Sequence, residues 1–424
     1  MARVLISFLG TGTSINQQTK NTGSVNYKEP REYRRANYHI NDKNLGEHTF
    51  VSLALRKAYN ADKAIMIGTV HSMWEEVYRY LRYNTDTNYQ PLDDPVYFEI
   101  AEHCETSNYQ SELYLPHKEE IEKELGKDSH VVLIKYGLTE SDINKNINII
   151  LSLEKYIHNG DEIIIDITHS FRSLPILITQ LLMYLKTISK KDITISHVFY
   201  GMLDITNELN GKTPIVDLTS ILNINDWIIG AYALQNYANG SKIADLIKNE
   251  DKSVSKLLSD FSNAMNLNHI MAIKSQIPRL ASIINKQYNS NLPKVIIPET
   301  IKKFVETFRN IDKQSLFELK LAEWQAKHHN YTSAYISMIE ACVSFICEKN
   351  KLNLNDFEDR EKAKRIIRGQ ESGNWKCDST ITEKFPHLNR QRNSLAHSIE
   401  AGQSLISMIK ELNDGIKTFM KIIN

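Results

Sequence analysis

The residues best suited to chemistry lie near the end of the 424-residue chain. If this segment is a helix, Asn393 and His397 are four residues apart and share one face, with Arg392 on its flank, while Leu388 and Leu395 face the core. Histidine transfers protons near neutral pH, and a guanidinium stabilises charge on a phosphate under attack. Arg392 and His397 therefore predict metal-free RNA cleavage by the substrate's 2′-hydroxyl, which leaves a cyclic 2′,3′-phosphate and a 5′-hydroxyl. The alternative is a surface helix whose charged residues face solvent.

Three polar segments in the first half of the chain could bind an anion. Residues 10–14, 68–72 and 168–175 each follow a predicted strand and offer hydroxyl groups and free backbone N–H groups. Ligands of open α/β sheets bind beyond such strand ends. The third segment adds Arg172 and leads into a helix whose first N–H groups favour a phosphate. These features predict a nucleotide-type ligand, with Thr69, Ser72 and an adenine-stacking Trp74 among the candidate contacts.

Two common nucleotide motifs are absent from these segments. Ile15 occupies the third glycine position of a dinucleotide fingerprint, and none of the three segments contains Gly-Lys-Ser/Thr. His169 is either a ligand contact or a loop histidine. Asp166 is expected to brace its loop by accepting backbone N–H bonds. No His, Cys, Asp or Glu set has metal-ligand spacing, so we predict no metal site.

The pattern of apolar residues predicts two structural halves. Apolar runs alternate with helical segments up to residue 222, which is typical of a Rossmann-like, mostly parallel sheet with flanking helices. Residues 223–424 have helical spacing and predict an all-α domain. Residues 286–298 look like a loop that splits it. The predicted strands are 4–9, 64–67, 131–134, 163–167, 193–200 and 215–218, and the predicted helices include 49–59, 73–82, 140–157, 174–188 and 405–423.

Composition excludes several classes of protein. Lys and Arg together number 51, as do Asp and Glu, so the chain is not a generically basic nucleic-acid coat. It contains no apolar run of about 20 residues that would span a membrane. Four cysteines without Cys-x-x-Cys spacing are typical of a reducing compartment, and we expect the protein in the cytoplasm.

The chain resembles the CARF–HEPN ribonucleases of type III CRISPR systems. Residues 392–397 look like the Arg-x-x-x-x-His motif of HEPN ribonucleases, and residues 8–12 and 166–175 are similar to the ligand loops of CARF domains. The resemblance implies a CARF domain at 1–222 and a HEPN domain at 223–424. It implies catalytic roles for Arg392 and His397, supported by Asn393. It also implies a ring-binding site lined by Thr11, Gly12, Thr13, Thr168, His169, Ser170 and Arg172.

The same resemblance implies partners and regulation. Paired CARF domains of a homodimer, or of a higher even oligomer, would bind cyclic oligoadenylate, with the tetra-adenylate favoured over the hexa-adenylate. Paired HEPN domains would form one site that cleaves single-stranded RNA without a cofactor.

A basic cluster formed by Arg360, Lys362, Lys364, Arg365 and Arg368 would guide RNA to this site, or would simply be a solvated helix face. The alternative function is a non-catalytic sensor whose helical domain binds RNA or a partner protein.

Overall fold

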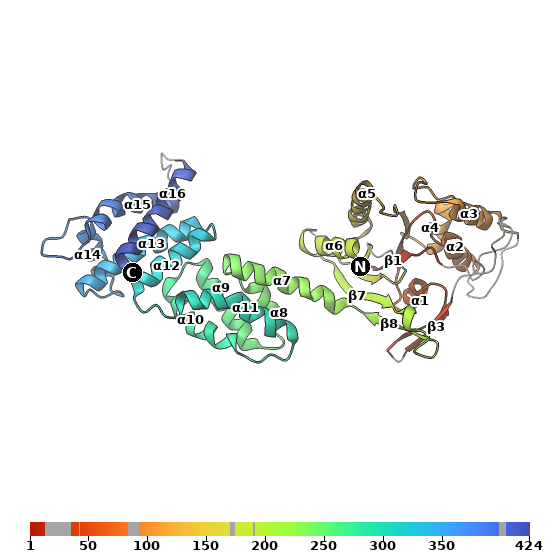
Figure 1. The fold of residues 1–424 in the computed structure, drawn as a ribbon, viewed down its shortest axis with the longest axis horizontal. Coiled ribbons are helices and arrows are strands. Elements are labelled where there is room, and N and C mark those ends of the chain that lie inside the picture. Colours follow the sequence, from red (N-terminus) through yellow and green to blue (C-terminus); the bar gives the residue numbers. More distant parts are fainter. Residues whose placement is uncertain (13–34, 42, 84–92, 170–173, 190, 398–403) are drawn as a thin grey trace. The chain divides into compact units, whose positions relative to one another are not determined.

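The computed structural model describes residues 1–12, 35–41, 43–83, 93–169, 174–189, 191–397 and 404–424. The chain forms two compact units, Met1–Asn223 and Ile224–Asn424, which are described separately (Figure 1). The division lies one residue from the boundary expected from the sequence. Within the described residues, no helix combines the length and hydropathy that crossing a membrane would require.

The first unit is built on a mostly parallel sheet. Its described strands lie in the order β3-β2-β8-β7-β6-β1-β4-β5, and only β2–β3 and β7–β8 are antiparallel pairs. This arrangement confirms the predicted fold class. The strands are β1 (Arg3–Leu9), β2 (Ala36–Ile40), β3 (Lys43–His48), β4 (Lys63–Gly68), β5 (His130–Leu133), β6 (Glu162–Asp166), β7 (Thr194–Gly201) and β8 (Lys212–Asp217).

Helices cover both faces of this sheet, which explains its continuous apolar strands. Along β1, Val4 and Ile6 pack in one hydrophobic core with helices α5 and α6, whereas Leu5 packs on the opposite face. Burial on both faces removes the alternation of polar and apolar residues. The helices are α1 (Val51–Ala58), α2 (Trp74–Tyr83), α3 (Pro95–Thr106), α4 (Lys118–Leu125), α5 (Glu140–Leu151) and α6 (Leu174–Thr187), with 3-10 turns η2 (Ser152–Tyr156) and η3 (Leu203–Ile205).

The second unit is helical and contains two hydrophobic cores that share α12. One core spans residues 227–321 and the other spans 319–423. Phe317 and Leu321 of α12 pack in the first core, and Leu319 and Ala322 pack in the second. The helices are α7 (Thr219–Tyr237), which begins in the first unit, α8 (Ser241–Ile247), α9 (Lys252–Asn266), α10 (Ile270–Ile284), α11 (Asn291–Phe308), α12 (Gln314–Lys327), α13 (Tyr331–Asn350), α14 (Phe357–Ile367), α15 (Ser379–His397) and α16 (Leu405–Ile423).

The structure corrects the predicted loop at residues 286–298. Helix α11 begins at Asn291 and includes both prolines of that segment. Pro293 lies in the first turn, where its missing N–H would have no intrahelical partner anyway. Pro298 lies farther inside, where the buried neighbours Ile297 and Ile301 hold the helix in the first core. Tertiary packing therefore outweighs the helix-breaking tendency of proline here.

A buried carboxyl group in α12 predicts a pH dependence of stability. Glu318 is 4% exposed, and burial raises its pKa to about 7, while Gln314, Ser344 and Arg360 act in the opposite direction. The folded protein thus holds this proton more tightly than the unfolded chain. The contribution of Glu318 to the free energy of unfolding is fully present below pH 4.5, the pKa of this carboxyl group in the unfolded chain. It decreases by about 3 kcal/mol as the pH rises towards 7.

We expect Glu318→Gln to remove most of this loss. Urea unfolding between pH 4.5 and 8 should show a flatter stability profile for the variant and a higher free energy of unfolding at pH 8. Equal profiles for both proteins would show that Glu318 is ionised in the folded state.

Candidate functional site

Three loops meet at the carboxyl ends of adjacent strands in the first unit. Strand β1 pairs with β4 on one side and with β6 on the other, and all three are parallel. After β1 the chain forms β2 and β3 at the far edge, then β4 and β5 on one side of β1 and β6 on its other side, so β1 and β6 flank the topological switch point. Ligands of open α/β sheets bind at such a point. The segments after β1, β4 and β6 are the three polar loops expected from the sequence.

The loop after β4 supports the loop after β1. Ser72 Oγ donates to Leu9 O at 2.8 Å, and Met73 N donates to Gly10 O at 3.1 Å. Thr69 N donates to Ser72 Oγ at 2.9 Å, which closes the second loop on itself. Gly12 has φ +66°, a conformation that favours glycine. These bonds hold residues 10–12 at the rim.

The loop after β6 is fixed by a buried carboxylate. Asp166 is fully buried and accepts from Ser7 Oγ at 2.7 Å and from Thr168 N at 3.0 Å, which confirms its predicted bracing role. Thr168 Oγ1 accepts from Gly201 N at 2.8 Å. A Cβ on Gly201 would lie 3.0 Å from Thr168 Cγ2, so only glycine fits there without displacement. Ser7 and Gly201 are supports that sequence analysis missed; the glycine at the end of a predicted strand was the available signal.

His169 lies against the first loop at the switch point. A Cβ on Gly10 would lie 3.3 Å from His169 O, so the two backbones are in close approach. His169 Nε2 is buried and has no hydrogen-bond partner among the described residues. Burial lowers the pKa of His169, and the nearby Asp166 raises it less. The imidazole is therefore neutral at pH 7 and can accept or donate one further hydrogen bond.

Three sequence-predicted contacts are supports instead. Trp74 is 0% exposed, packs in a core with Met73 and Val77, and donates from Nε1 to Thr69 O at 2.8 Å. Thr69 and Ser72 are also fully buried. Their loop folds inwards, so stacking of Trp74 on an adenine is wrong for this conformation. Thr11, Gly12, Thr168 and His169 remain at least partly accessible. The candidates Thr13, Ser170 and Arg172 lie outside the described residues.

Helix α15 carries the C-terminal motif, as predicted. Leu388 is buried and Leu395 is partly buried in the second helical core, which confirms that this side of the helix is anchored. Helix α16 crosses closely there, because a Cβ on Gly415 would lie 3.0 Å from Leu388 Cδ1. The opposite face of α15 is consequently free to present polar groups.

Arg392 and Asn393 contact each other on this helix. Arg392 is half-buried, and its Nη1 donates to Asn393 Oδ1 at 3.0 Å. Arg392 Nε is buried without a partner among the described residues, so the guanidinium retains hydrogen-bonding capacity. His397 is the last residue of α15, one turn beyond Asn393; its side chain lies outside the described part of the structure.

Most of the predicted basic cluster is paired within the chain. Arg360 contacts Glu340, Lys364 contacts Glu361 at 2.7 Å, and Arg365 contacts Glu371 at 2.7 Å. Lys362 Nζ lies 4.3 Å from the ring centroid of Trp375. Arg368, of the five, has neither a salt bridge nor a ring contact among the described residues. The cluster as a whole is therefore a network on the surface of α14.

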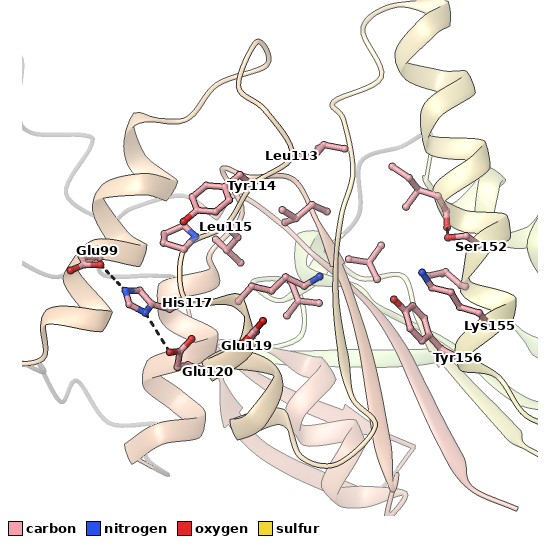
Figure 2. A pocket seen from close by; sticks show the side chains of 17 residues that line it. Glu99, Leu113, Tyr114, Leu115, His117, Glu119, Glu120, Ser152, Lys155 and Tyr156 are labelled. Atoms are coloured by element: carbon pink, nitrogen blue, oxygen red, sulfur yellow. Dashed lines mark hydrogen bonds and ion pairs between the residues drawn. The ribbon is translucent and has the colours of Figure 1, made fainter.

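A separate pocket of about 830 Å³ lies beside the edge strand β5. Figure 2 shows His117 between Glu99 and Glu120, with Lys155 and Tyr156 on the other side. His117 Nε2 lies 2.6 Å from Glu99 Oε2, and this hydrogen bond raises the pKa of His117. None of the lining residues belongs to the rim loops, so the pocket is distinct from the site at the switch point.

Comparisons with known proteins agree with this layout. Residues 4–204 match the family model of the CARF domain of CRISPR system endoribonuclease Csx1, and residues 223–315 match the second domain of CRISPR-associated protein MJ1674. The chain is 31% identical over 415 residues to the CRISPR-associated protein MJ1674 of Methanocaldococcus jannaschii. That alignment covers 94% of this chain and 62% of the relative, so the chain spans less than two thirds of it.

A solved structure, Enterococcus italicus Csm6 bound to cyclic hexa-2′-fluoro-hexa-dAMP, aligns with the whole chain. The alignment covers 93% of that protein at 12% identity with a TM-score of 0.39. The fold assignment rests on the sheet topology and on the family match over residues 4–204.

Proposed function

Because residues 4–204 match the CARF domain of CRISPR system endoribonuclease Csx1, we propose that the chain is an endoribonuclease of type III CRISPR defence. Cyclic oligoadenylate bound at the CARF rim would activate metal-independent cleavage of single-stranded RNA by the second unit. The observation that carries the catalytic part is helix α15, where the half-buried Arg392 and Asn393 precede His397 by five and four residues on a helix anchored by Leu388 and Leu395.

The rim supports the proposed ligand. The backbone N–H groups of Thr11 and Gly12 and the hydroxyls of Thr11 and Thr168 lie at the switch point, where they suit a phosphodiester. The neutral His169 supplies a further hydrogen bond to a base or a sugar. Arg172, from the same loop, is proposed to neutralise a phosphate. Thr13 and Ser170 are proposed to line the same site with their hydroxyl groups. A tetra-adenylate is the ring that we favour over a hexa-adenylate.

The reaction follows from the groups on α15. The substrate's 2′-oxygen attacks the adjacent phosphorus while a base removes its proton, and the bond from phosphorus to the 5′-oxygen breaks as that oxygen gains a proton. His397 is proposed to transfer protons, and Arg392 to stabilise the charge on the phosphate oxygens. One chain supplies one such pair, so a two-fold homodimer would provide a separate base and acid. Ring binding would shift the paired helices and couple the two sites.

We expect the purified protein to cut single-stranded RNA in EDTA only after cyclic oligoadenylate is added. Gel analysis should show products with cyclic 2′,3′-phosphate and 5′-hydroxyl ends. Tight RNA binding without shortening, with and without the ring, would instead support the non-catalytic sensor. Native mass spectrometry of the protein incubated with the tetra-adenylate and the hexa-adenylate would report ring size and stoichiometry together.

A further inference from the structure

A second pocket continues the catalytic face of α15 towards the start of the helix. It has a volume of about 470 Å³ and is lined on this helix by Thr382, Pro386, Asn389, Arg390 and Asn393. Four of these residues recur at steps of four, three and four, which places them in one row along the helix. The next step of four from Asn393 reaches His397. The pocket and the catalytic motif therefore share one face.

The other wall of this pocket is the end of α14 and the turn after it. Ile367, Arg368 and Gln370 line the pocket there. Arg368 and Arg390 are exposed, and neither forms a salt bridge within 4 Å among the described residues. The neighbouring Lys364 and Arg365 are both paired with glutamates. The pocket thus brings together two guanidinium groups that retain their capacity to bind an anion.

The polar lining also suits a nucleotide. Gln370 and Asn389 provide side-chain amides, which can donate to and accept from a base edge. Pro386 has no N–H, so it cannot bond the carbonyl oxygen of Thr382 four residues earlier. That oxygen belongs to a residue lining the same pocket and can accept from an amino group or a ribose 2′-hydroxyl.

The spacing along α15 separates this pocket from the site of cleavage. Arg390 and His397 are seven residues apart, or about 10 Å along the helix axis. This spacing leaves room for a second phosphate beside the one attacked near His397, on an RNA that extends along the helix.

We propose that this pocket binds a nucleotide of single-stranded RNA that flanks the cleaved one. Arg368 and Arg390 bind its backbone phosphate, and Gln370 and Asn389 contact its base. The proposal rests on the proposed ribonuclease function and adds a specific substrate-binding subsite to it. The pocket fixes the register of the RNA, so Arg390 acts in binding and positioning, and the reacting atoms lie one to two turns away.

The test is RNA binding by full-length protein that carries His397→Ala, which keeps the RNA intact. We compare Arg368→Ala, Arg390→Ala and the control Lys384→Ala, which removes an exposed charge from the opposite side of α15. Fluorescence anisotropy with a labelled single-stranded RNA should show about tenfold weaker binding for each arginine variant. The slope of log affinity against log salt should fall by about 0.7 per arginine and stay unchanged for Lys384→Ala.

A second measurement separates this proposal from the ribonuclease proposal. With His397 intact, Arg390→Ala should raise KM about tenfold and leave kcat nearly unchanged. Equal losses for Arg390→Ala and Lys384→Ala, or an unchanged salt slope in both arginine variants, would overturn the subsite. A protein that never cleaves RNA, yet loses binding in the arginine variants, would overturn the ribonuclease function and leave the RNA site standing. Thermal melting of each variant excludes unfolding as the cause.

Discussion

His397→Ala is expected to lower ring-activated RNA cleavage about a thousandfold, while ring binding at the CARF rim stays unchanged. General acid–base catalysis by one positioned side chain contributes roughly 10² to 10⁴ in rate. In a two-fold site the substitution removes the histidine from both chains at once, so both proton transfers are affected. Single-turnover cleavage of a labelled RNA, together with calorimetric titration of the ring, measures the two quantities independently.

The same helix offers a matched control for this experiment. His387 is an exposed histidine of α15 whose Nε2 lies 2.7 Å from Glu411 Oε2. His387→Ala removes only this surface hydrogen bond and should leave the cleavage rate within about twofold of wild type. Native-rate cleavage by His397→Ala would refute the catalytic assignment. An equal loss in both variants would indicate damage to the helix.

The architecture was predictable wherever burial left a strong pattern. Strands such as β1 and β6 are apolar on both faces, and their sequences show this directly. Strands β2 and β3 were missed: β2 is only five residues long, with Ala36 and Tyr38 buried, and every residue of β3 is at least partly exposed. Strands β2 and β3 pair locally, whereas the parallel pairing of β2 with β8 joins segments distant in sequence, which a local pattern does not contain.

The candidate sites also differ in whether a local sequence pattern is enough to predict them. The polar face of α15 follows from helical periodicity alone, so the sequence is enough to place Arg392, Asn393 and His397 together. The subsite at Arg368 and Arg390 could not be predicted in this way, because it depends on where the end of α14 meets α15 and on which charges are already paired. The inward fold of the loop after β4 is likewise a tertiary feature.

Trp74→Ala is expected to destabilise the first unit by about 3–5 kcal/mol, the largest stability effect that we predict. The indole is fully buried, packs against the core beneath β4 and donates a hydrogen bond to Thr69 O. Its removal leaves a large cavity, and the surrounding helices close it only in part. The loop after β4 then loses its support, which in turn loosens the loop after β1. Urea unfolding followed by circular dichroism measures the loss.

Trp74→Phe distinguishes this supporting role from adenine stacking. Phenylalanine keeps an aromatic ring in the core but cannot donate to Thr69 O, an oxygen that also accepts from Ser72 N at 3.1 Å. We therefore expect a loss of only about 1 kcal/mol in stability and a change in ring affinity below about threefold. Ring affinity reduced more than tenfold in a variant of nearly native stability would mean that the indole turns outwards to stack on the ligand. If stability and ring affinity decrease in proportion, Trp74 acts like Asp166, as a residue that holds the rim loops in position for binding.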